Sequence, residues 1–455
     1  MKRKILYFFL LLLLAVTGFG VFWQKRSPQE YNQDPYITLN GELDTTAFFE
    51  NEAHKEDELL SVEESKIYAQ GAVLMDGNSG RVLWSKNGEE KKPNASTTKI
   101  LTCILALERG NFEKKVEVSG NAASMPSVKL HMQKGEYYNL EDLLYSLMLE
   151  SHNDSAVAIA EHVAGSVEAF SEMMNDKAKE IGAGNSFFIT PNGLDGEKER
   201  VNQVGNKEIL FHGTTPKDLA KIMQYCILKS PKREEFLRIT REQNYTFHNR
   251  VQTEEGDWKE GGRTFSCQNH NALLQLLSGT LSGKTGYTAK AGYCYVGAIE
   301  QDGRTYIVAL LGCGWPNHKN YKWEDSKRLF QYAVNHFTAV KPVLDIDLPQ
   351  IPVLQGIDSG ADFFAKQVIN PQIDIEDLEI LLTKEDTLTY QVRLKRELEA
   401  PIQEGEKIGT LLLRVNDSQD ETVWVKDYSL YADHTIPRKT WQDIWTYVCK
   451  RYVVM

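Results

Sequence analysis

Residues 96–99, Ser96-Thr97-Thr98-Lys99, place a hydroxyl and an ammonium group three positions apart at the start of an apolar run. Positions i and i+3 lie on one face of a helix, so the lysine is expected to point where the serine points. The largely apolar residues 99–107, followed by Arg109-Gly110, predict a buried helix that ends there. Burial lowers the pKa of a lysine and allows it to accept the serine proton. The stretch therefore predicts a serine nucleophile with a lysine base.

Two further motifs follow in the order that this chemistry requires. Ser151-His152-Asn153 ends an apolar stretch, and Lys284-Thr285-Gly286 precedes two strand-like runs. An isolated Ser-x-x-Lys is usually a helix cap followed by a lysine that extends to water. This pattern occurs once in the chain, and the three motifs together favour catalysis.

The motifs resemble those of the serine penicillin-binding proteins and serine β-lactamases. Longer stretches are similar to the D-alanyl-D-alanine carboxypeptidases among them: PNASTTK (93–99), AASM (122–125), PNGL (191–194), KTGYT (284–288) and AGYC (291–294). The resemblance covers about residues 65–337. It implies an α+β catalytic domain, in which helices flank an antiparallel sheet and the active site lies between the sheet and a helical lobe.

The resemblance also implies the chemistry. Ser96 would attack the carbonyl between two terminal D-alanines of a peptidoglycan stem peptide, and Lys99 would accept its proton. Ser151 would relay a proton to the leaving amine, and Asn153 would position the substrate amide. β-Lactam antibiotics would acylate the same serine.

The third motif would bind the substrate. Lys284 and Thr285 would receive the terminal carboxylate, and Gly286 would let the strand approach it closely. The backbone N–H groups of Ser96 and Tyr287 would form the oxyanion hole. Water would then hydrolyse the acyl-enzyme, with no metal or cofactor.

Ser-x-Asn is a weak pattern that occurs three times, because Ser85-Lys86-Asn87 and Ser119-Gly120-Asn121 also match it. Context favours Ser151, which stands between an apolar helix and a second helical stretch. Ser119 is the main competitor. His152 departs from the glycine that the resembling family commonly has at that position.

Composition limits the other possibilities. A chain of 455 residues with 42% hydrophobic content can form two domains, and a net charge of −11 argues against a nucleic-acid partner. The six cysteines lack C-x-x-C spacing, so a metal site is not expected. Buried free thiols are the default, with a Cys294–Cys313 bridge as the alternative.

The chain divides into five segments. Residues 1–26 contain an uncharged run, 5–23, that is long enough to span a bilayer, and a cleaved signal peptide is the alternative. Residues 27–64 are acidic and predict a solvated linker. The catalytic domain (65–337) precedes a β-rich domain (338–433), which is similar to the carboxy-terminal domain of the carboxypeptidases. The catalytic part is expected outside the cell membrane, anchored or secreted.

Residues 434–455 predict an amphipathic helix with Trp441, Trp445 and flanking basic residues. Such a helix can lie on a membrane surface or pack on the β domain, and the resemblance favours the membrane.

Three other functions share parts of this pattern. A class A β-lactamase would need a deacylating Glu-x-x-Leu-Asn, which this chain lacks. A peptidoglycan endopeptidase would share the motifs, and a penicillin-binding sensor or scaffold would keep acylation without turnover.

Overall fold

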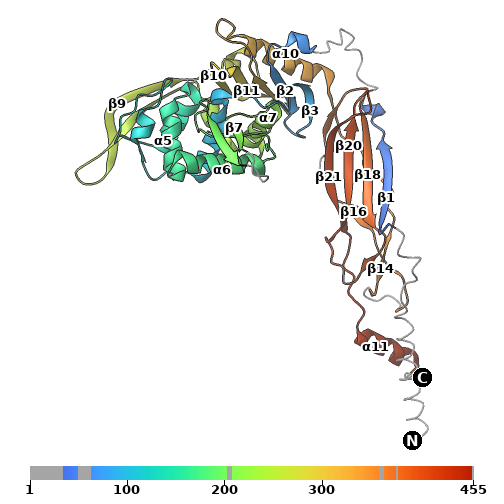
Figure 1. The fold of residues 1–455 in the computed structure, drawn as a ribbon. Coiled ribbons are helices and arrows are strands. Elements are labelled where there is room, and N and C mark those ends of the chain that lie inside the picture. Colours follow the sequence, from blue (N-terminus) through green and yellow to red (C-terminus); the bar gives the residue numbers. More distant parts are fainter. Residues whose placement is uncertain (1–33, 50–62, 202–206, 358–362, 376–377, 453–455) are drawn as a thin grey trace.

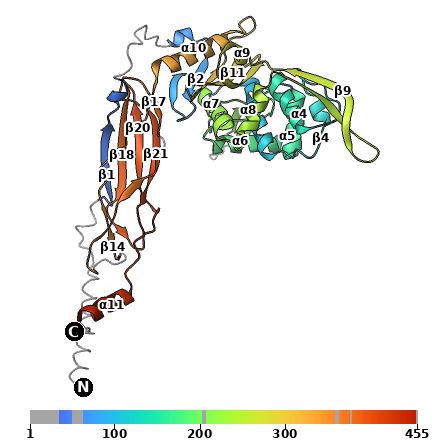
Figure 2. The ribbon, with the colours of Figure 1, turned by 180° about the vertical axis from the view of Figure 1, so that it is seen from behind.

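The computed structural model describes residues 34–49, 63–201, 207–357, 363–375 and 378–452. Two lobes meet at an angle, one made of helices around a sheet and the other an elongated stack of strands (Figures 1 and 2). Helices and antiparallel sheets in the first lobe, with an all-β second lobe, confirm the predicted fold class.

An antiparallel five-stranded sheet forms the centre of the catalytic lobe, in the order β10-β11-β12-β2-β3. Its strands come from both ends of the lobe's sequence: β2 (Gly71–Asp76), β3 (Val82–Lys86), β10 (Thr280–Thr288), β11 (Gly292–Gln301) and β12 (Arg304–Leu311). Side chains alternate between its faces. On β2, Val73 joins the core beneath the helical region, and Leu74 joins the core beneath helix α10 (Tyr321–His336).

The predicted helices between the two halves of the sheet are present. They are α2 (Lys99–Arg109), α4 (Leu140–Tyr145), α5 (Asn153–Ala164), α6 (Val167–Glu180) and α7 (Pro216–Gln224). A short π-helical turn (Ser146–Glu150) continues α4, and another (Tyr225–Lys229) continues α7. Helix α2 is buried from Lys99 to Leu107, so apolar groups surround the lysine at its start.

A long hairpin of β8 (Asn244–Gln252) and β9 (Trp258–Gln268) was not predicted. It extends from the catalytic lobe on the side away from the β lobe (Figure 1). Tyr138 packs against Phe247 and Phe265, with ring centroids 6.3 and 5.8 Å away. One face of the hairpin is polar, and the other has few apolar residues. The alternation that predicts a strand is therefore weak in this part of the sequence.

The β lobe contains a five-stranded antiparallel sheet in the order β1-β18-β20-β21-β16. Its strands are β1 (Tyr36–Leu43), β16 (Pro371–Ile373), β18 (Thr387–Lys395), β20 (Lys407–Asn416) and β21 (Thr422–Ala432). A smaller sheet combines β14 (Ile351–Leu354), β15 (Gln367–Ile369) and β19 (Leu398–Glu399).

Strand β1 corrects the prediction that residues 27–64 form a solvated linker. It pairs with β18 along its length, from Tyr36↔Lys395 to Leu43↔Leu388. Ile37, Leu39 and Leu43 lie on one face of the strand, at alternate positions that also include Gly41, and pack on the β-lobe core. The acidic composition of the segment hid this period of two.

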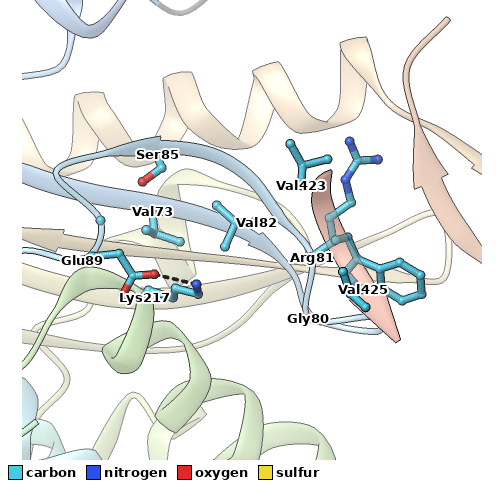
Figure 3. A pocket seen from close by; sticks show the side chains of 11 residues that line it. Val73, Gly80, Arg81, Val82, Ser85, Glu89, Lys217, Val423 and Val425 are labelled. Atoms are coloured by element: carbon cyan, nitrogen blue, oxygen red, sulfur yellow. Dashed lines mark hydrogen bonds and ion pairs between the residues drawn. The ribbon is translucent and has the colours of Figure 1, made fainter. Parts of the chain in front are cut away.

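A buried ion pair joins the two lobes. Arg81, which precedes β3, places Nη2 2.7 Å from Asp386 Oδ2, and both side chains are only 4% exposed. Arg81 also donates to Leu381 O, in strand β17 (Ile380–Leu382). Next to this pair, Val73 and Lys217 of the catalytic lobe face Val423 and Val425 of β21 across a pocket of about 370 Å³ (Figure 3).

Helix α11 (Trp441–Tyr452) lies at the end of the β lobe farthest from the catalytic lobe (Figures 1 and 2). Tyr447 packs on Phe363, with ring centroids 5.2 Å apart, whereas Trp441 and Trp445 are 72% and 57% exposed. No helix among the described residues is long and apolar enough to cross a bilayer. The predicted span at 5–23 lies outside them.

Asp386→Ala is expected to lower the free energy of unfolding by about 3–5 kcal/mol, because it leaves the Arg81 charge buried without its partner. Urea denaturation followed by tryptophan fluorescence measures the change. Glu63→Ala is the control, since it removes a partner from the exposed Lys66–Glu63 pair and should cost less than about 1 kcal/mol. If the two variants unfolded at the same urea concentration, the Arg81–Asp386 pair would not stabilise the junction between the lobes.

Candidate active site

Lys99 is surrounded by three oxygen atoms. Its Nζ lies 2.8 Å from Ser96 Oγ. It also lies 2.9 Å from Asn153 Oδ1 and 2.8 Å from the backbone oxygen of Asn192. The last two are carbonyl oxygens and can only accept hydrogen bonds. They occupy both N–H groups of a neutral lysine, which leaves its lone pair to accept the proton from the Ser96 hydroxyl.

The surroundings of Lys99 favour this neutral form. Its side chain is fully buried. Burial, together with the positive charge of Lys284, holds the pKa of Lys99 well below its usual range, and Asp154 opposes the shift. The lysine can therefore act as a base at a pH where an exposed lysine could not.

The backbone around Ser96 is tightly constrained. Ser96 lies in a 3₁₀ turn (Ala95–Thr98), where residues three apart eclipse one another, and Lys99 begins α2 directly after it. Ala95 has φ +48°, an uncommon conformation for a residue with a side chain. Gly193 has φ +81°, and a Cβ there would lie 1.9 Å from Ala95 O. The loop at 191–194 can approach the nucleophile only because this position is glycine.

His212 joins this loop to the start of α2. Its Nε2 lies 2.9 Å from Thr98 Oγ1, and its Nδ1 accepts from Ile189 N at 3.0 Å. Burial lowers the pKa of His212 to about 3, so the ring stays neutral and can hold both bonds. The residue thus ties the backbone just before the loop at 191–194 to the turn that carries Ser96.

Among the three Ser-x-Asn sequences, the structure brings only Ser151-His152-Asn153 to Lys99. Ser151 has φ +68°, lines the cleft beside Ser96, and its buried Oγ has no hydrogen-bond partner among the described residues. Ser119 instead accepts from Ala122 N and caps helix α3 (Gly120–Ala123). Ser85 lies in β3.

Asn153 also contacts Lys99, which the sequence did not predict. Its Oδ1 accepts from Lys99, and its Nδ2 donates to Pro126 O at 3.2 Å. The residue lines the cleft, and its Nδ2 carries a second N–H besides the one that Pro126 O accepts. In this arrangement Asn153 orients the lysine, and its contact with a substrate amide stays a prediction.

The Lys284-Thr285-Gly286 motif lies on edge strand β10, beside the Ser96 turn. Lys284 is 2% exposed, and burial lowers its pKa to about 7 against an opposing contribution from Glu150. A Cβ on Gly286 would lie 2.8 Å from Ser96 N, so the glycine lets the strand backbone pass next to that amide. Thr285 and Tyr287 line the cleft.

A model of the D-alanyl-D-alanine carboxypeptidase family, Peptidase_S11, matches residues 58–314. The chain belongs to this family.

Curated relatives of this carboxypeptidase align over most of their length. DacF of Bacillus subtilis is 29% identical over 355 residues, which cover 76% of this chain and 81% of the relative. DacC of Escherichia coli is 28% identical over 374 residues, covering 79% and 84%. Both are named D-alanyl-D-alanine carboxypeptidases.

Solved structures share the fold. Penicillin-binding protein 5 of Haemophilus influenzae has a TM-score of 0.60 at 23% identity and covers 82% of this chain and 98% of its own. The D-alanyl-D-alanine carboxypeptidase DacD of Francisella tularensis has a TM-score of 0.57 at 21% identity, covering 85% and 98%.

The cleft of this carboxypeptidase, with a volume of about 420 Å³, contains residues that the sequence did not single out. Glu150 accepts from Gln268 N at 2.8 Å and lies 2.9 Å from His270 Nε2. Lys322 and Trp323 of α10 form another part of the wall. Asn192 belongs to the PNGL stretch noted above. Its backbone carbonyl accepts from Lys99, a contact that depends on the tertiary fold and that no local sequence pattern predicts.

The described residues contain no cluster of three or more His, Cys, Asp or Glu side chains that could hold a metal ion. Cys294 and Cys313 are free buried thiols, so the alternative disulfide is not formed.

The acylation rate of the carboxypeptidase is expected to rise with pH as Lys99 loses its proton, because only the neutral amine is a base. Lys284→Met removes a positive charge that lowers the pKa of Lys99. The rise should therefore move to higher pH. Stopped-flow acylation by a fluorescent penicillin across a pH series measures its midpoint.

Lys290→Met is the matched control for this pH series. Lys290 is exposed and pairs with Glu197 at 3.1 Å. The same midpoint in the parent and in Lys284→Met would show that Lys284 does not act on the base.

Proposed function

We propose that this serine carboxypeptidase removes the terminal D-alanine from peptidoglycan stem peptides through a Ser96 acyl-enzyme. The observation that carries the proposal is the position of Lys99, whose two N–H groups meet fixed carbonyl oxygens while its lone pair faces Ser96. A lysine that only extended to water would not be fully buried.

The reaction proceeds in two halves. Ser96 Oγ attacks the penultimate D-alanine carbonyl while Lys99 takes its proton, and the backbone N–H groups of Ser96 and Tyr287 receive the developing oxyanion. Ser151, whose hydroxyl has no partner among the described residues, passes a proton to the leaving amine. Water then attacks the acyl-enzyme with the same base and releases the shortened peptide.

Residues of strand β10 bind the substrate on the other side of the cleft. Thr285 and Lys284 bind the terminal carboxylate, the first through its hydroxyl and the second through its charge. Lys284 also stabilises the negative charge that develops near Ser96. β-Lactams, which carry a carboxylate beside a reactive carbonyl, follow the same path and acylate Ser96.

Release of free D-alanine from a pentapeptide, compared with cleavage of a cross-linked dimer, tests the reaction. We expect D-alanine release at the higher kcat/KM. Cleavage of the dimer alone would identify an endopeptidase, and acylation without turnover would identify a sensor or scaffold.

A labelled penicillin is expected to attach to Ser96, as peptide mass spectrometry would show. Ser151→Ala should slow acylation by about 100-fold or more, because it removes a proton-transfer group. Ser119→Ala should leave the acylation rate within about twofold, since Ser119 only caps α3. The reverse order of the two variants would mean that Ser119 belongs to the active site.

We also propose that the enzyme works on the outer face of the bacterial cell membrane, with α11 on the lipid surface. Trp441 and Trp445 lie one helical turn apart and are exposed, while Tyr447 holds the helix to the β lobe through Phe363. Arg438 and Lys439 bind groups of the β lobe. Arg438 donates to Glu399 and Gln355, and Lys439 donates to Phe363 O.

Replacing Trp441 and Trp445 by Ser is expected to weaken binding to phosphatidylglycerol vesicles by about tenfold or more, because two apolar side chains no longer enter the lipid. Vesicle co-sedimentation of a chain without residues 1–26 measures this, since a retained first segment would hide it. Trp258→Ser, in the β8–β9 hairpin, is the control. Unchanged binding of the double variant would refute the surface helix.

A further inference from the structure

Ser151 is held in a backbone conformation that a residue with a side chain rarely adopts. Its φ of +68° lies in the left-handed region, where the following carbonyl oxygen crowds the Cβ atom. Its buried Oγ has no hydrogen-bond partner among the described residues. No contact of its own side chain therefore fixes the hydroxyl, and the position of that hydroxyl depends on how firmly the surrounding structure holds the backbone.

The turn that leads to Ser151 begins at Ser146. The π-helical turn (Ser146–Glu150) closes with a hydrogen bond from Ser151 N to Ser146 O, and His152 N lies 3.5 Å from the same oxygen. A π-helical turn contains one residue more than an α-helical turn and is frequent at functional sites. Because Ser146 accepts the bond that closes this turn, a contact that fixes Ser146 also constrains Ser151.

The side chain of His152 makes such a contact. Its Nδ1 lies 2.8 Å from Ser146 Oγ, and that hydroxyl lies 2.7 Å from Ser155 Oγ in the first turn of α5. All three side chains are buried. Burial lowers the pKa of His152 against the opposing charges of Asp154 and Glu150, so the ring is neutral at neutral pH. A buried group of three hydrogen-bonded side chains therefore joins the π-helical turn to α5.

The residue after His152 is anchored as well. Asn153 N donates to Val128 O at 2.8 Å, and Asn153 Oδ1 accepts from Lys99. Ser151 and Asn153 line the cleft, whereas His152 between them does not. The His152 ring can therefore act on the reaction only through its neighbours.

We propose that His152 is a positioning residue for proton transfer: its bond to Ser146 holds the left-handed turn that directs the Ser151 hydroxyl toward the leaving nitrogen. This inference rests on the proposed function, in which Ser151 passes a proton to the leaving group. The glycine that the family commonly has at this position offers no side chain to Ser146. In this chain a side-chain contact holds the turn in addition to the backbone.

Two polar replacements in the full-length enzyme isolate the Nδ1 contact. His152→Asn keeps a polar atom bonded to Cγ, as Nδ1 is, whereas His152→Gln places its polar atoms one carbon farther from the backbone. His162→Asn is the matched control, because His162 lies on the same helix, outside the cleft lining, and contacts Asn111 O. Stopped-flow acylation by a fluorescent penicillin gives the rate at saturation and the half-saturating concentration for each protein.

His152→Gln should lower the acylation rate at saturation by about tenfold or more, because a hydroxyl that is no longer held in place transfers its proton less often. The half-saturating concentration should stay within about twofold, since His152 does not line the cleft. His152→Asn should recover most of the rate, and His162→Asn should match the parent. Equal rates for the Asn and Gln variants at position 152, or a change confined to the half-saturating concentration, would overturn the proposal.

The same substitution on a Ser151→Ala background distinguishes positioning from general support of the fold. If His152 acts through the Ser151 hydroxyl, His152→Gln should cost less than about twofold in a chain that already lacks this hydroxyl. A loss of the same size on both backgrounds would overturn the proposal, since the ring would then support the site independently of Ser151. Failure of the proposed function gives a different result. The parent would release no D-alanine from a pentapeptide, while the penicillin series would still decide whether His152 positions Ser151.

Discussion

The active site depends on keeping one lysine neutral in a buried position. Three separate segments converge on Lys99: the turn that carries Ser96, the first turn of α5 with Asn153, and the loop that presents the Asn192 carbonyl. Each supplies one oxygen. Burial in the first turn of α2 lowers the pKa of the lysine. Removing one of these oxygens would free an N–H group and let the amine turn away from the serine.

Strand β10 gives the cleft its two-sided chemistry. One face of the strand meets the Ser96 turn, where Gly286 allows backbone to approach backbone. On the opposite face of the sheet, α10 packs on the neighbouring strand β11, where Trp323 meets Tyr295. Because alternate residues serve different faces, a three-residue motif can supply the nucleophile's environment and the substrate's binding surface at once.

Local patterns were enough to predict the three motifs, the main helices and the two halves of the central sheet. They were not enough for contacts between distant segments. The pairing of β1 with β18 joins residues from opposite ends of the chain, and acidic neighbours masked its alternation. The contact of Asn153 with Lys99 likewise depends on tertiary packing, which no spacing in the sequence encodes.

The length of the β lobe separates the catalytic lobe from α11 (Figure 1). Strand β20 has 10 residues, and at about 3.4 Å per residue such a strand extends about 34 Å. The catalytic lobe is at one end of this sheet and α11 is at the other (Figure 1). The buried Arg81–Asp386 pair joins the two lobes. The sheet therefore holds the catalytic lobe at a set distance from α11. With α11 on lipid, the cleft would sample a narrow layer of the wall at a fixed depth, and stem peptides closer to the bilayer would escape it.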